Sequence, residues 1–225
     1  MVFFCFLLFA MLTAVAAIPQ DLSGKMFIFP QPTNTAQVML TTSIQNFSAF
    51  TVCPLQISVE YTPFSLWPHL QFSMKSVFSK SLAADVMDFY IRGNNVEVAG
   101  QGYKLNTWQS ICTTWDSASG LVQLWLDGKP SSRKFISSGS NISGPIVIVL
   151  GQDQDSFGGG FDAAQSFVGM MSDVYMWDYV LSPCEIQRYM DERNFPTGNV
   201  LNWGALEFVT MGRVLIENKQ SLYCK

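Results

Sequence analysis

The sequence predicts an all-β protein, a two-sheet antiparallel sandwich of the jelly-roll type with one helix near residues 182–193. Three observations support this fold class. Most of the chain divides into short segments rich in β-branched and aromatic residues. Turn-forming residues recur roughly every eight to twelve positions, which is typical of a sandwich rather than of a βαβ fold. A helical pattern with a clear start signal stands out in one segment only.

The strands are predicted from apolar runs that end at turn residues. The segment Leu121–Leu126 is followed by a turn signal at 127–130. Segments 87–91 and 96–98 flank a polar stretch at 92–95, which predicts a hairpin. The continuous apolar run Ile146–Leu150 is typical of a strand covered on both faces, and 174–177 predicts a further short strand.

The predicted helix begins at a capping box. Ser182 stands at N-cap, Pro183 at N1 and Glu185 at N3. The apolar face that follows consists of Ile186, Tyr189 and Met190, and Asn194 and Pro196 are expected to end the helix. We expect this helix to pack on one face of the sandwich.

The first 17 residues carry no charged side chain, and small residues at 15–17 suit a signal-peptidase site. We therefore expect a secretory signal peptide over 1–17 and a single domain over 18–225. An uncleaved membrane anchor is the alternative, although the run is short for a span. No other stretch predicts a membrane span. The net charge of −4 argues against nucleic acid or an anionic membrane as partner.

Four cysteines follow the leader, namely Cys53, Cys112, Cys184 and Cys224. In a secreted chain they suggest two disulfides, for which three connectivities are possible. No pair of them has the spacing of a zinc finger, and His69 is the only histidine. A structural zinc site is therefore not expected.

An acidic loop carries the strongest signal of chemistry. Asp153, Asp155 and Asp162 fall in one glycine-rich segment, with Gln165 just beyond. Carboxylates this close repel one another unless a cation lies between them, and Ca²⁺ takes about six to eight oxygen ligands from such groups. The spacing is not that of an EF-hand. The residues alone leave two interpretations open, a calcium site or a solvated acidic loop.

The segment 108–117 resembles the pentraxin signature, which runs His-x-Cys-x-Ser/Thr-Trp-x-Ser/Thr. Cys112, Thr114, Trp115 and Ser117 match it, and Ser110 stands where the family has histidine. Further segments resemble the family in the same order along the chain: 27–30, 50–53, 124–130, 150–159, 176–183 and 199–203. The chain is similar throughout to short pentraxins of the C-reactive protein and serum amyloid P type, whose sandwich is shared with concanavalin and laminin-G domains.

This resemblance implies a disulfide between Cys53 and Cys112. The period-two alternation of a strand places Cys112 and Trp115 on opposite faces, so both faces of that strand are expected to be buried. Cys184 and Cys224 are then left over. We expect them to tie the C-terminal tail to the start of the helix, with a bridge between subunits as the alternative.

The resemblance also implies calcium ligands at Asp153, the Gln154 carbonyl, Asp155, Asp162 and Gln165. The family binds two ions, and an Asp-Asn pair earlier in the chain completes one of them. Residues 83–84 at that place are both alanine. Asp85 follows directly and would substitute only after a shift of the loop. We therefore expect one strong calcium site and a second site that is weak or absent.

Phosphocholine-binding pentraxins pack the choline on an apolar residue and place a carboxylate beside its ammonium group. Phe89 aligns with the apolar residue, and Glu97 aligns with a threonine of the pocket floor. No acid occurs at the carboxylate position, near 101–102. We expect binding of phosphate monoesters or acidic sugars, with phosphocholine preference open. The alternative for Phe89 is a plain core residue.

The resemblance implies a secreted pattern-recognition protein of innate immunity, of the acute-phase type, assembled as a cyclic homopentamer. The face opposite the ligand sites would recruit complement or Fc receptors. The alternatives are a calcium-dependent lectin or laminin-G adhesion module and a purely structural oligomer. An enzyme is not expected, because His69 has no serine motif near it and the clustered carboxylates do not lie in a glycosidase strand pattern.

Two sequons, Asn46-Phe47-Ser48 and Asn141-Ile142-Ser143, predict N-glycosylation where the asparagine is exposed. Asn141 lies between turn residues and is the stronger candidate.

Overall fold

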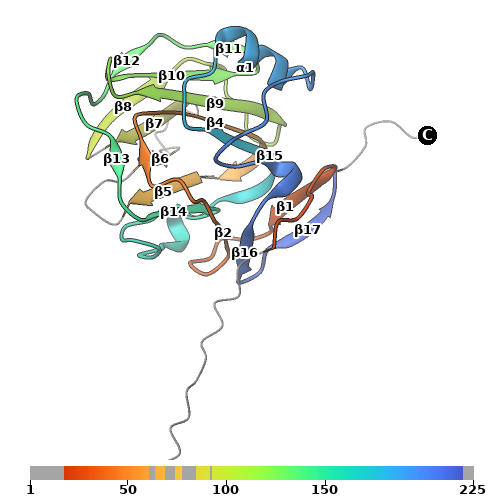
Figure 1. Cartoon of the computed structure of the whole chain (residues 1–225). Coiled ribbons are helices and arrows are strands. Elements are labelled where there is room, and N and C mark those ends of the chain that lie inside the picture. The colour runs from red at the N-terminus through yellow and green to blue at the C-terminus, as the bar shows by residue number, and fades with distance from the viewer. Residues whose placement is uncertain (1–17, 61–63, 69–73, 78–84, 92, 220–225) are drawn as a thin grey trace, which may run out of the picture.

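The computed structural model describes residues 18–60, 64–68, 74–77, 85–91 and 93–219 (Figure 1). The larger sheet contains β1 (Lys25–Phe29), β4 (Ala49–Glu60), β9 (Gln109–Asp116), β10 (Leu121–Leu126), β11 (Lys129–Pro130), β12 (Lys134–Phe135), β15 (Val168–Trp177) and β17 (Leu215–Asn218). The second sheet contains β2 (Gln37–Leu40), β5 (Phe64–Pro68), β6 (Met74–Val77), β7 (Val86–Ile91), β8 (Asn94–Ala99), β14 (Ile146–Leu150) and β16 (Phe208–Met211). The remaining elements are the short pair β3 (Asn46–Phe47) and β13 (Ile142–Ser143), the helix α1 (Pro183–Met190), and the 3₁₀ turns η1 (Ala163–Gln165) and η2 (Trp203–Ala205).

The predicted two-sheet antiparallel sandwich is confirmed. The larger sheet runs β11-β10-β9-β4-β15-β1-β17, with β12 also on β10, and the second runs β16-β2-β14-β5-β6-β7-β8. The predicted strands Leu121–Leu126 and Ile146–Leu150 are β10 and β14. The predicted hairpin is β7–β8, but its turn is tighter than 92–95, because β8 already begins at Asn94 beside Ile91. Gly93, with φ +76°, supplies the left-handed backbone that such a turn requires.

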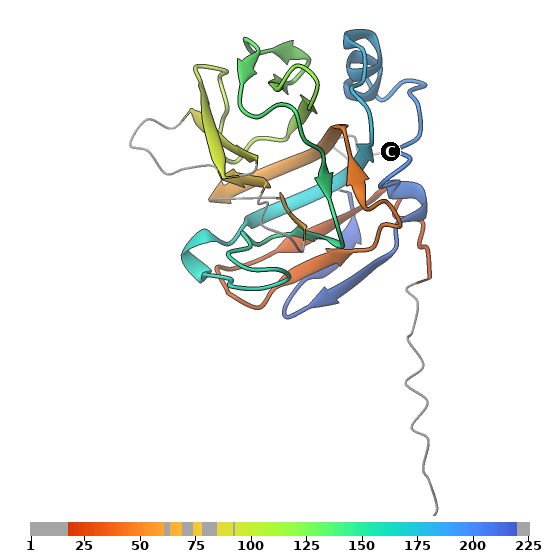
Figure 2. The same cartoon turned by 60° about the vertical axis from the view of Figure 1, so that its left-hand side comes forward.

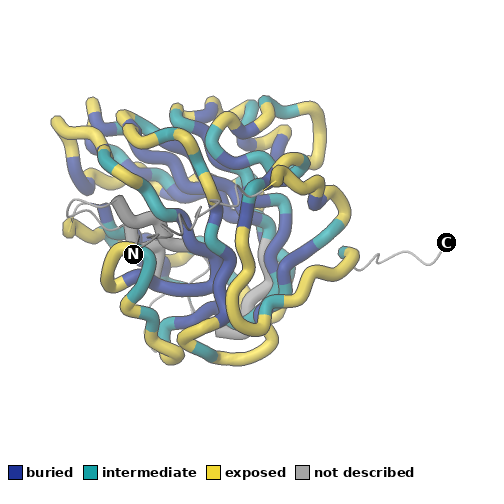
Figure 3. Tube along the Cα trace, turned by 60° about the horizontal axis from the view of Figure 1, so that its bottom comes forward, coloured by how far each residue is buried: buried dark blue, intermediate teal, exposed yellow. Residues whose placement is uncertain are grey.

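Strand β9 is buried on both faces, as its alternation predicts. Trp115 points into the core between the sheets, where its Nε1 donates to the Ser137 carbonyl oxygen at 3.1 Å. Cys112 points to the other side, into a smaller cluster beneath α1. In Figure 3 the buried segments, drawn dark blue, run through the middle of the sandwich. The two faces of β9 therefore contribute to two separate hydrophobic cores, one between the sheets and one beneath α1.

Aromatic rings fill the main core. Phe27 of β1 meets Trp203 and Phe208 edge to face, each at a centroid distance of 5.2 Å. Phe29 meets Phe167 in the same way at 5.4 Å. Such pairs add about 0.5–1.5 kcal/mol each beyond the area that they bury. They tie β1 of the larger sheet to η2, to β16 of the second sheet and to the segment before β15.

The smaller core joins the helix to the larger sheet. The predicted disulfide Cys53–Cys112 is present and links β4 to β9. Ile186 and Tyr189 of α1 pack over it, and both are buried. The Tyr189 hydroxyl lies 3.2 Å from the Cys53 carbonyl oxygen and 2.9 Å from that of Asp173. The helix is thereby fixed on the outer face of the sheet by packing and by one buried hydroxyl.

The capping box at the start of α1 is confirmed, but the predicted end is wrong. The Ser182 hydroxyl accepts from the Glu185 backbone N–H, and the Glu185 carboxylate accepts from the Ser182 N–H. The helix ends at Met190 and not near 193. Glu192, with φ +52°, takes the left-handed C-terminal position that glycine or asparagine usually fills. The residues at this position, Asp191 and Glu192, are not of the types that usually end a helix, so the sequence did not indicate the end.

Strand β15 begins at Val168, six residues before the predicted segment 174–177. A bulge between Ser172 and Tyr175 breaks its pairing with β4, and Asp173 there has φ +51°. The extra residue disturbs the alternation of inward and outward side chains, so the pattern indicated only the part after the bulge.

Replacing Ser182 with alanine removes one half of the capping box. We expect the free energy of unfolding to fall by about 1 kcal/mol, the usual cost of losing such a cap. Denaturant unfolding of the purified protein measures it. Ser132→Ala, at an exposed position, is the control and should leave the midpoint unchanged. An equal loss in both variants would contradict the importance of the cap.

Candidate functional site

The acidic loop connects β14 to β15 and is anchored at its base. Gly151 has φ +89° and packs so closely on the Phe29 ring that a Cβ there would collide with it. The Gln152 amide donates to the carbonyl oxygens of Thr33 and Ala36 at 2.7 and 2.8 Å. These bonds hold the loop against the connection between β1 and β2. Sequence reasoning missed Gln152 as the residue that positions the loop.

The next residues combine burial with a tight turn. Asp153 and Gln154 are fully buried. The Gln154 side-chain oxygen accepts from the Gly158 N–H at 3.0 Å. The Asp155 N–H donates to the Gly159 carbonyl oxygen at 3.1 Å, and Asp155 itself is exposed. The turn therefore places one acidic side chain below the surface and the next one at the surface.

The end of the loop is capped by the third carboxylate. Asp162 is the N-cap of η1, and its Oδ1 accepts from the Ala164 N–H at 2.9 Å. Gln165 closes the same turn through its own N–H, which donates to the Asp162 carbonyl oxygen at 2.9 Å. The Ser166 hydroxyl, which follows, accepts from the Thr33 N–H at 3.1 Å. Both ends of the loop thus rest on the same N-terminal segment.

The donor set fits calcium in its chemistry. Carboxylate, amide and carbonyl oxygens are the ligands that Ca²⁺ takes, and a fully buried carboxylate at Asp153 is a position where a cation offsets the cost of burial. Within the described ranges, however, no three His, Cys, Asp or Glu side chains are gathered as a metal group. Asp153, Gln154, Asp155, Asp162 and Gln165 share one loop, and their role as ligands stays a prediction.

Asp85 is committed to backbone contacts in this structure. Its two carboxylate oxygens accept from the N–H groups of Gly102 and Tyr103, each at 2.8 Å. These bonds close the connection between β8 and β9. A calcium role for Asp85 stays a prediction, and it would require the carboxylate to share or leave these bonds. Residues 83–84 lie outside the described residues.

The two predicted ligand-contact residues point to different sides of the second sheet. Phe89 is 5% exposed and belongs to the main core, which agrees with its alternative interpretation. Glu97 is exposed on β8, opposite Asp88 of β7. Its carbonyl oxygen accepts from the Lys134 ammonium at 2.6 Å. Ligand contact by either residue stays a prediction.

Asp88 was missed by the sequence analysis. It is 5% exposed, and its Oδ1 has no hydrogen-bond partner among the described residues. Burial raises the pKa of this carboxyl, and the facing charge of Glu97 raises it further. The signal was a single acid inside the apolar run of β7. Two carboxyls in register, one buried and one exposed, give this side of the sheet an acidic character.

The Asp88→Asn variant should be more stable than the wild type at neutral pH. The pKa of the Asp88 carboxyl is higher in the folded state than in the unfolded state. The protonated carboxyl therefore stabilises the folded state most below the ordinary carboxyl pKa near 4, and this stabilisation is lost as the pH rises through the pKa of the folded state. We expect the melting temperature to rise by a few degrees at pH 7, since about 1 kcal/mol shifts it by about 2–4 °C in a domain of this size.

Thermal unfolding between pH 7 and pH 3 measures this difference, which should shrink as the pH falls. Asp116→Asn is the control of opposite sign, because hydrogen bonds from Ser119 and Ala118 lower the pKa of Asp116. That variant should lose stability at pH 7 and lose less at low pH. A constant difference across the pH range for Asp88→Asn would contradict the assignment.

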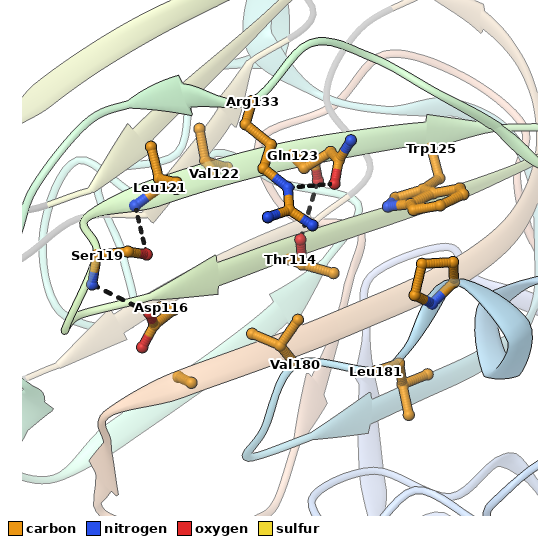
Figure 4. Close-up of a pocket in the computed structure, with 12 residues that line it drawn as sticks. Thr114, Asp116, Ser119, Leu121, Val122, Gln123, Trp125, Arg133, Val180 and Leu181 are labelled. Carbon is orange, nitrogen blue, oxygen red and sulfur yellow. Dashed lines mark hydrogen bonds between the residues drawn. The ribbon is translucent and has the colours of Figure 1, made fainter.

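A groove of about 380 Å³ lies on the outer face of the larger sheet, beside the segment that leads into α1 (Figure 4). Leu121, Trp125 and Val180 give it apolar walls. Arg133 extends over it, held by a bond from its Nε to the Gln123 Oε1 at 3.1 Å. Sequence reasoning missed this groove, because its walls come from two strands and from a distant segment before the helix.

The groove and the acidic loop lie at opposite ends of the molecule. The loop after β14 is at one end in both views, and α1 is at the other (Figures 1 and 2). A ligand on the loop would therefore leave the surface around α1 free. Among the helices in the described ranges, none is long and apolar enough to cross a membrane.

The remaining predicted residues have the following places. Cys184 is exposed in the first turn of α1 and is not bonded to Cys53 or Cys112. Cys224 and His69 lie outside the described residues, so the second disulfide stays a prediction. Asn46 and Asn141 are both exposed, which meets the condition set for glycosylation.

Comparison with known proteins places this arrangement among known folds. A sequence profile of the Pentaxin family matches residues 25–218. The C-reactive protein of Rattus norvegicus is 40% identical over 211 residues, which cover 88% of this chain and 86% of the relative. The serum amyloid P-component of Mus musculus is 37% identical over 214 residues, covering 92% and 93%. A native heptameric SAP-like pentraxin from Limulus polyphemus has a similar structure, with a TM-score of 0.76 at 23% identity over 88% of this chain and 96% of that one.

Proposed function

Because this chain belongs to the pentraxin family, we propose that it binds phosphate-bearing or acidic polysaccharide ligands, on microbes or damaged cells, through calcium held by the loop after β14. Its C-reactive protein and serum amyloid P relatives are non-enzymatic pattern-recognition proteins of innate immunity, and the chain shares that function. Those relatives are secreted serum proteins, and we propose secretion for this chain, with the leader at 1–17 removed.

The observation that carries the proposal is the buried carboxylate of Asp153 at the start of a loop anchored at both ends. Asp153 is fully buried, while Asp155 and Asp162 follow at the surface of the same loop. Calcium would neutralise the buried charge and would leave coordination positions open toward solvent. Anionic oxygens of a phosphate monoester or an acidic sugar are suitable ligands for those positions. The alternative of a lectin or laminin-G adhesion module has no separate observation in its favour.

We expect one calcium site to dominate. The loop supplies all five oxygen donors of the predicted set, at 153–155, 162 and 165. The second site depends on Asp85, whose carboxylate already accepts two backbone N–H groups. Calorimetric titration of the protein with calcium should therefore show one tight site and at most one weak site. Two equal, tight sites would contradict this expectation.

Asp155→Asn should weaken calcium binding by about tenfold or more, because it replaces a charged carboxylate ligand with a neutral amide. Even the loss of a group that only supports a metal ligand typically weakens metal binding by about 10–100-fold. Retention on a phosphocholine resin in calcium, followed by elution with a chelator or with free phosphocholine, measures the consequence for ligand binding. Asp191→Asn, which changes an exposed acid at the end of α1, is the matched control and should bind like the wild type. Retention of the wild type that a chelator does not reverse would contradict calcium dependence.

We further propose a cyclic homo-oligomer, with a pentamer expected. Apolar side chains are exposed at two opposite ends of the sandwich. One end has Val209, Met211, Leu215 and Ile216 on the edge strands β16 and β17, and the other has Phe135, Tyr179 and Val180 around the groove. Two different apolar patches at opposite ends favour a head-to-tail contact, which closes into a ring when the rotation allows it.

Ile216→Lys should dissociate the oligomer, because the new charge would be buried without a partner in the contact. Light scattering measures the mass, and circular dichroism checks the fold. Leu105→Lys, at an exposed leucine away from both patches, is the control and should keep the wild-type mass. Dissociation by both variants, or by neither, would contradict the assignment of this edge.

A ring of this kind presents all its calcium loops on one side. Five weak single contacts would then act together on a repetitive surface, with a gain from effective concentration. The side that carries α1 would remain exposed when the ligand side is occupied, whereas the rim of the groove would be covered by the neighbouring subunit. We infer that complement or Fc receptors bind on the side that carries α1.

A further inference from the structure

The two glycosylation sequons are neighbours in space. Although they are far apart in the sequence, Asn46-Phe47 forms β3 and Ile142-Ser143 forms β13, and these strands pair with each other. The register sets Phe47 opposite Ile142 and Asn46 opposite Ser143. The two sequons therefore lie antiparallel, centre against centre.

Side chains along the two strands alternate between the buried and the exposed face of the ladder. Phe47 and Ile142, the middle residues of the sequons, are buried in the main core. The residues on either side of them are all exposed, and these are the acceptor asparagines and the hydroxyl residues: Asn46, Ser48, Asn141 and Ser143. Since side chains alternate along a strand, the four share the outer face of this small ladder.

Backbone bonds hold the ladder in place beyond its two pairs. The Gly144 N–H donates to the Gln45 carbonyl oxygen at 2.9 Å, and the Ser117 N–H donates to the Ser48 carbonyl oxygen at 2.8 Å. The Ser117 hydroxyl lies 3.4 Å from the Asn141 Oδ1, in a hydrogen bond. That bond uses the oxygen of the amide and leaves its nitrogen, the atom that receives a sugar, outside the contact.

We propose that Asn46 and Asn141 both carry N-linked glycans, which rise side by side and form one shield over the β3–β13 ladder. This inference rests on the secretion that is part of the proposed function. The donor is a lipid-linked oligosaccharide pyrophosphate. A bond forms between the asparagine Nδ2 and C1 of the first sugar, the bond from C1 to the pyrophosphate oxygen breaks, the amide loses a proton to the medium, and the lipid pyrophosphate leaves.

The spacing makes the two glycans interfere with each other. Diagonal neighbours across two strands lie about 7–8 Å apart, which is small beside the reach of one oligosaccharide. Transfer takes place on the unfolded chain, so the spacing does not prevent it. Trimming and extension act on the folded protein, where each glycan hinders access of the processing enzymes to the other. In Figure 1, β13 and β17 are on opposite sides, so the shield leaves the β17 edge free.

The test uses the full chain secreted from a eukaryotic cell. Removal of all N-glycans should lower the mass of the wild type by two glycans, and that of Asn46→Gln or Asn141→Gln by one. In the wild type at least one glycan should remain sensitive to an endoglycosidase that cleaves only oligomannose chains. In each single variant the remaining glycan should become resistant. Ser48→Ala and Ser143→Ala remove the same acceptors while keeping the asparagines, and should reproduce both results.

Fewer than two glycans on the secreted wild type, or processing of each glycan that does not change when the other is removed, would overturn the proposal. Retention on the phosphocholine resin is measured on the same samples. Calcium-dependent retention of a secreted wild type that carries no glycan would refute the shield alone. A fully glycosylated wild type that is not retained, and that binds no calcium by calorimetry, would refute the proposed ligand function and leave the shield standing.

Discussion

The structure depends on one strand that is buried on both faces. Strand β9 sends Trp115 into the space between the sheets and Cys112 into the cluster under α1. A shift of β9 by one residue would exchange these two faces, and the indole would then have to fit where a disulfide belongs. The bond from Cys112 to Cys53 on β4 excludes that shift. The position of the helix and that of the opposite sheet are therefore set by the same register.

The sandwich also separates the two candidate surfaces of the molecule. The acidic loop follows β14 of the second sheet, and the groove lies on the outer face of the larger sheet (Figures 2 and 4). The aromatic core lies between them and is closely packed, so neither end contacts the other directly. A ligand bound at the acidic loop would therefore leave the surface around α1 uncovered.

Local signals in the sequence were sufficient for most of the fold. The alternation around Cys112 and Trp115, the capping box at Ser182 and the apolar run of β14 each specify their structure within a few residues. The two element boundaries that were predicted wrongly, the end of α1 and the start of β15, are set by tertiary contacts. Glu192 ends the helix in a conformation that favours glycine, and the bulge at Asp173 hides the first half of β15. Neither has a composition that marks it.

The candidate site was predictable in part for the same reason. The carboxylates of the acidic loop are close in sequence, so their clustering was visible at once. Asp88, by contrast, acquires its character from its burial and from Glu97 on the neighbouring strand. The groove beneath Arg133 brings together β9, β10 and the segment before α1, a combination that only the folded chain reveals.

The Gln152 amide has a consequence that extends beyond the loop itself. It joins the acidic loop to the carbonyl groups of Thr33 and Ala36, at the turn between the first two strands. An ion that binds only the ordered loop would stabilise the folded state by mass action, and this tether would pass the gain to the N-terminal strands. Calcium would then act as a folding ligand for β1 and β2, so that the chain without calcium would become vulnerable to proteases first at the turn between these two strands.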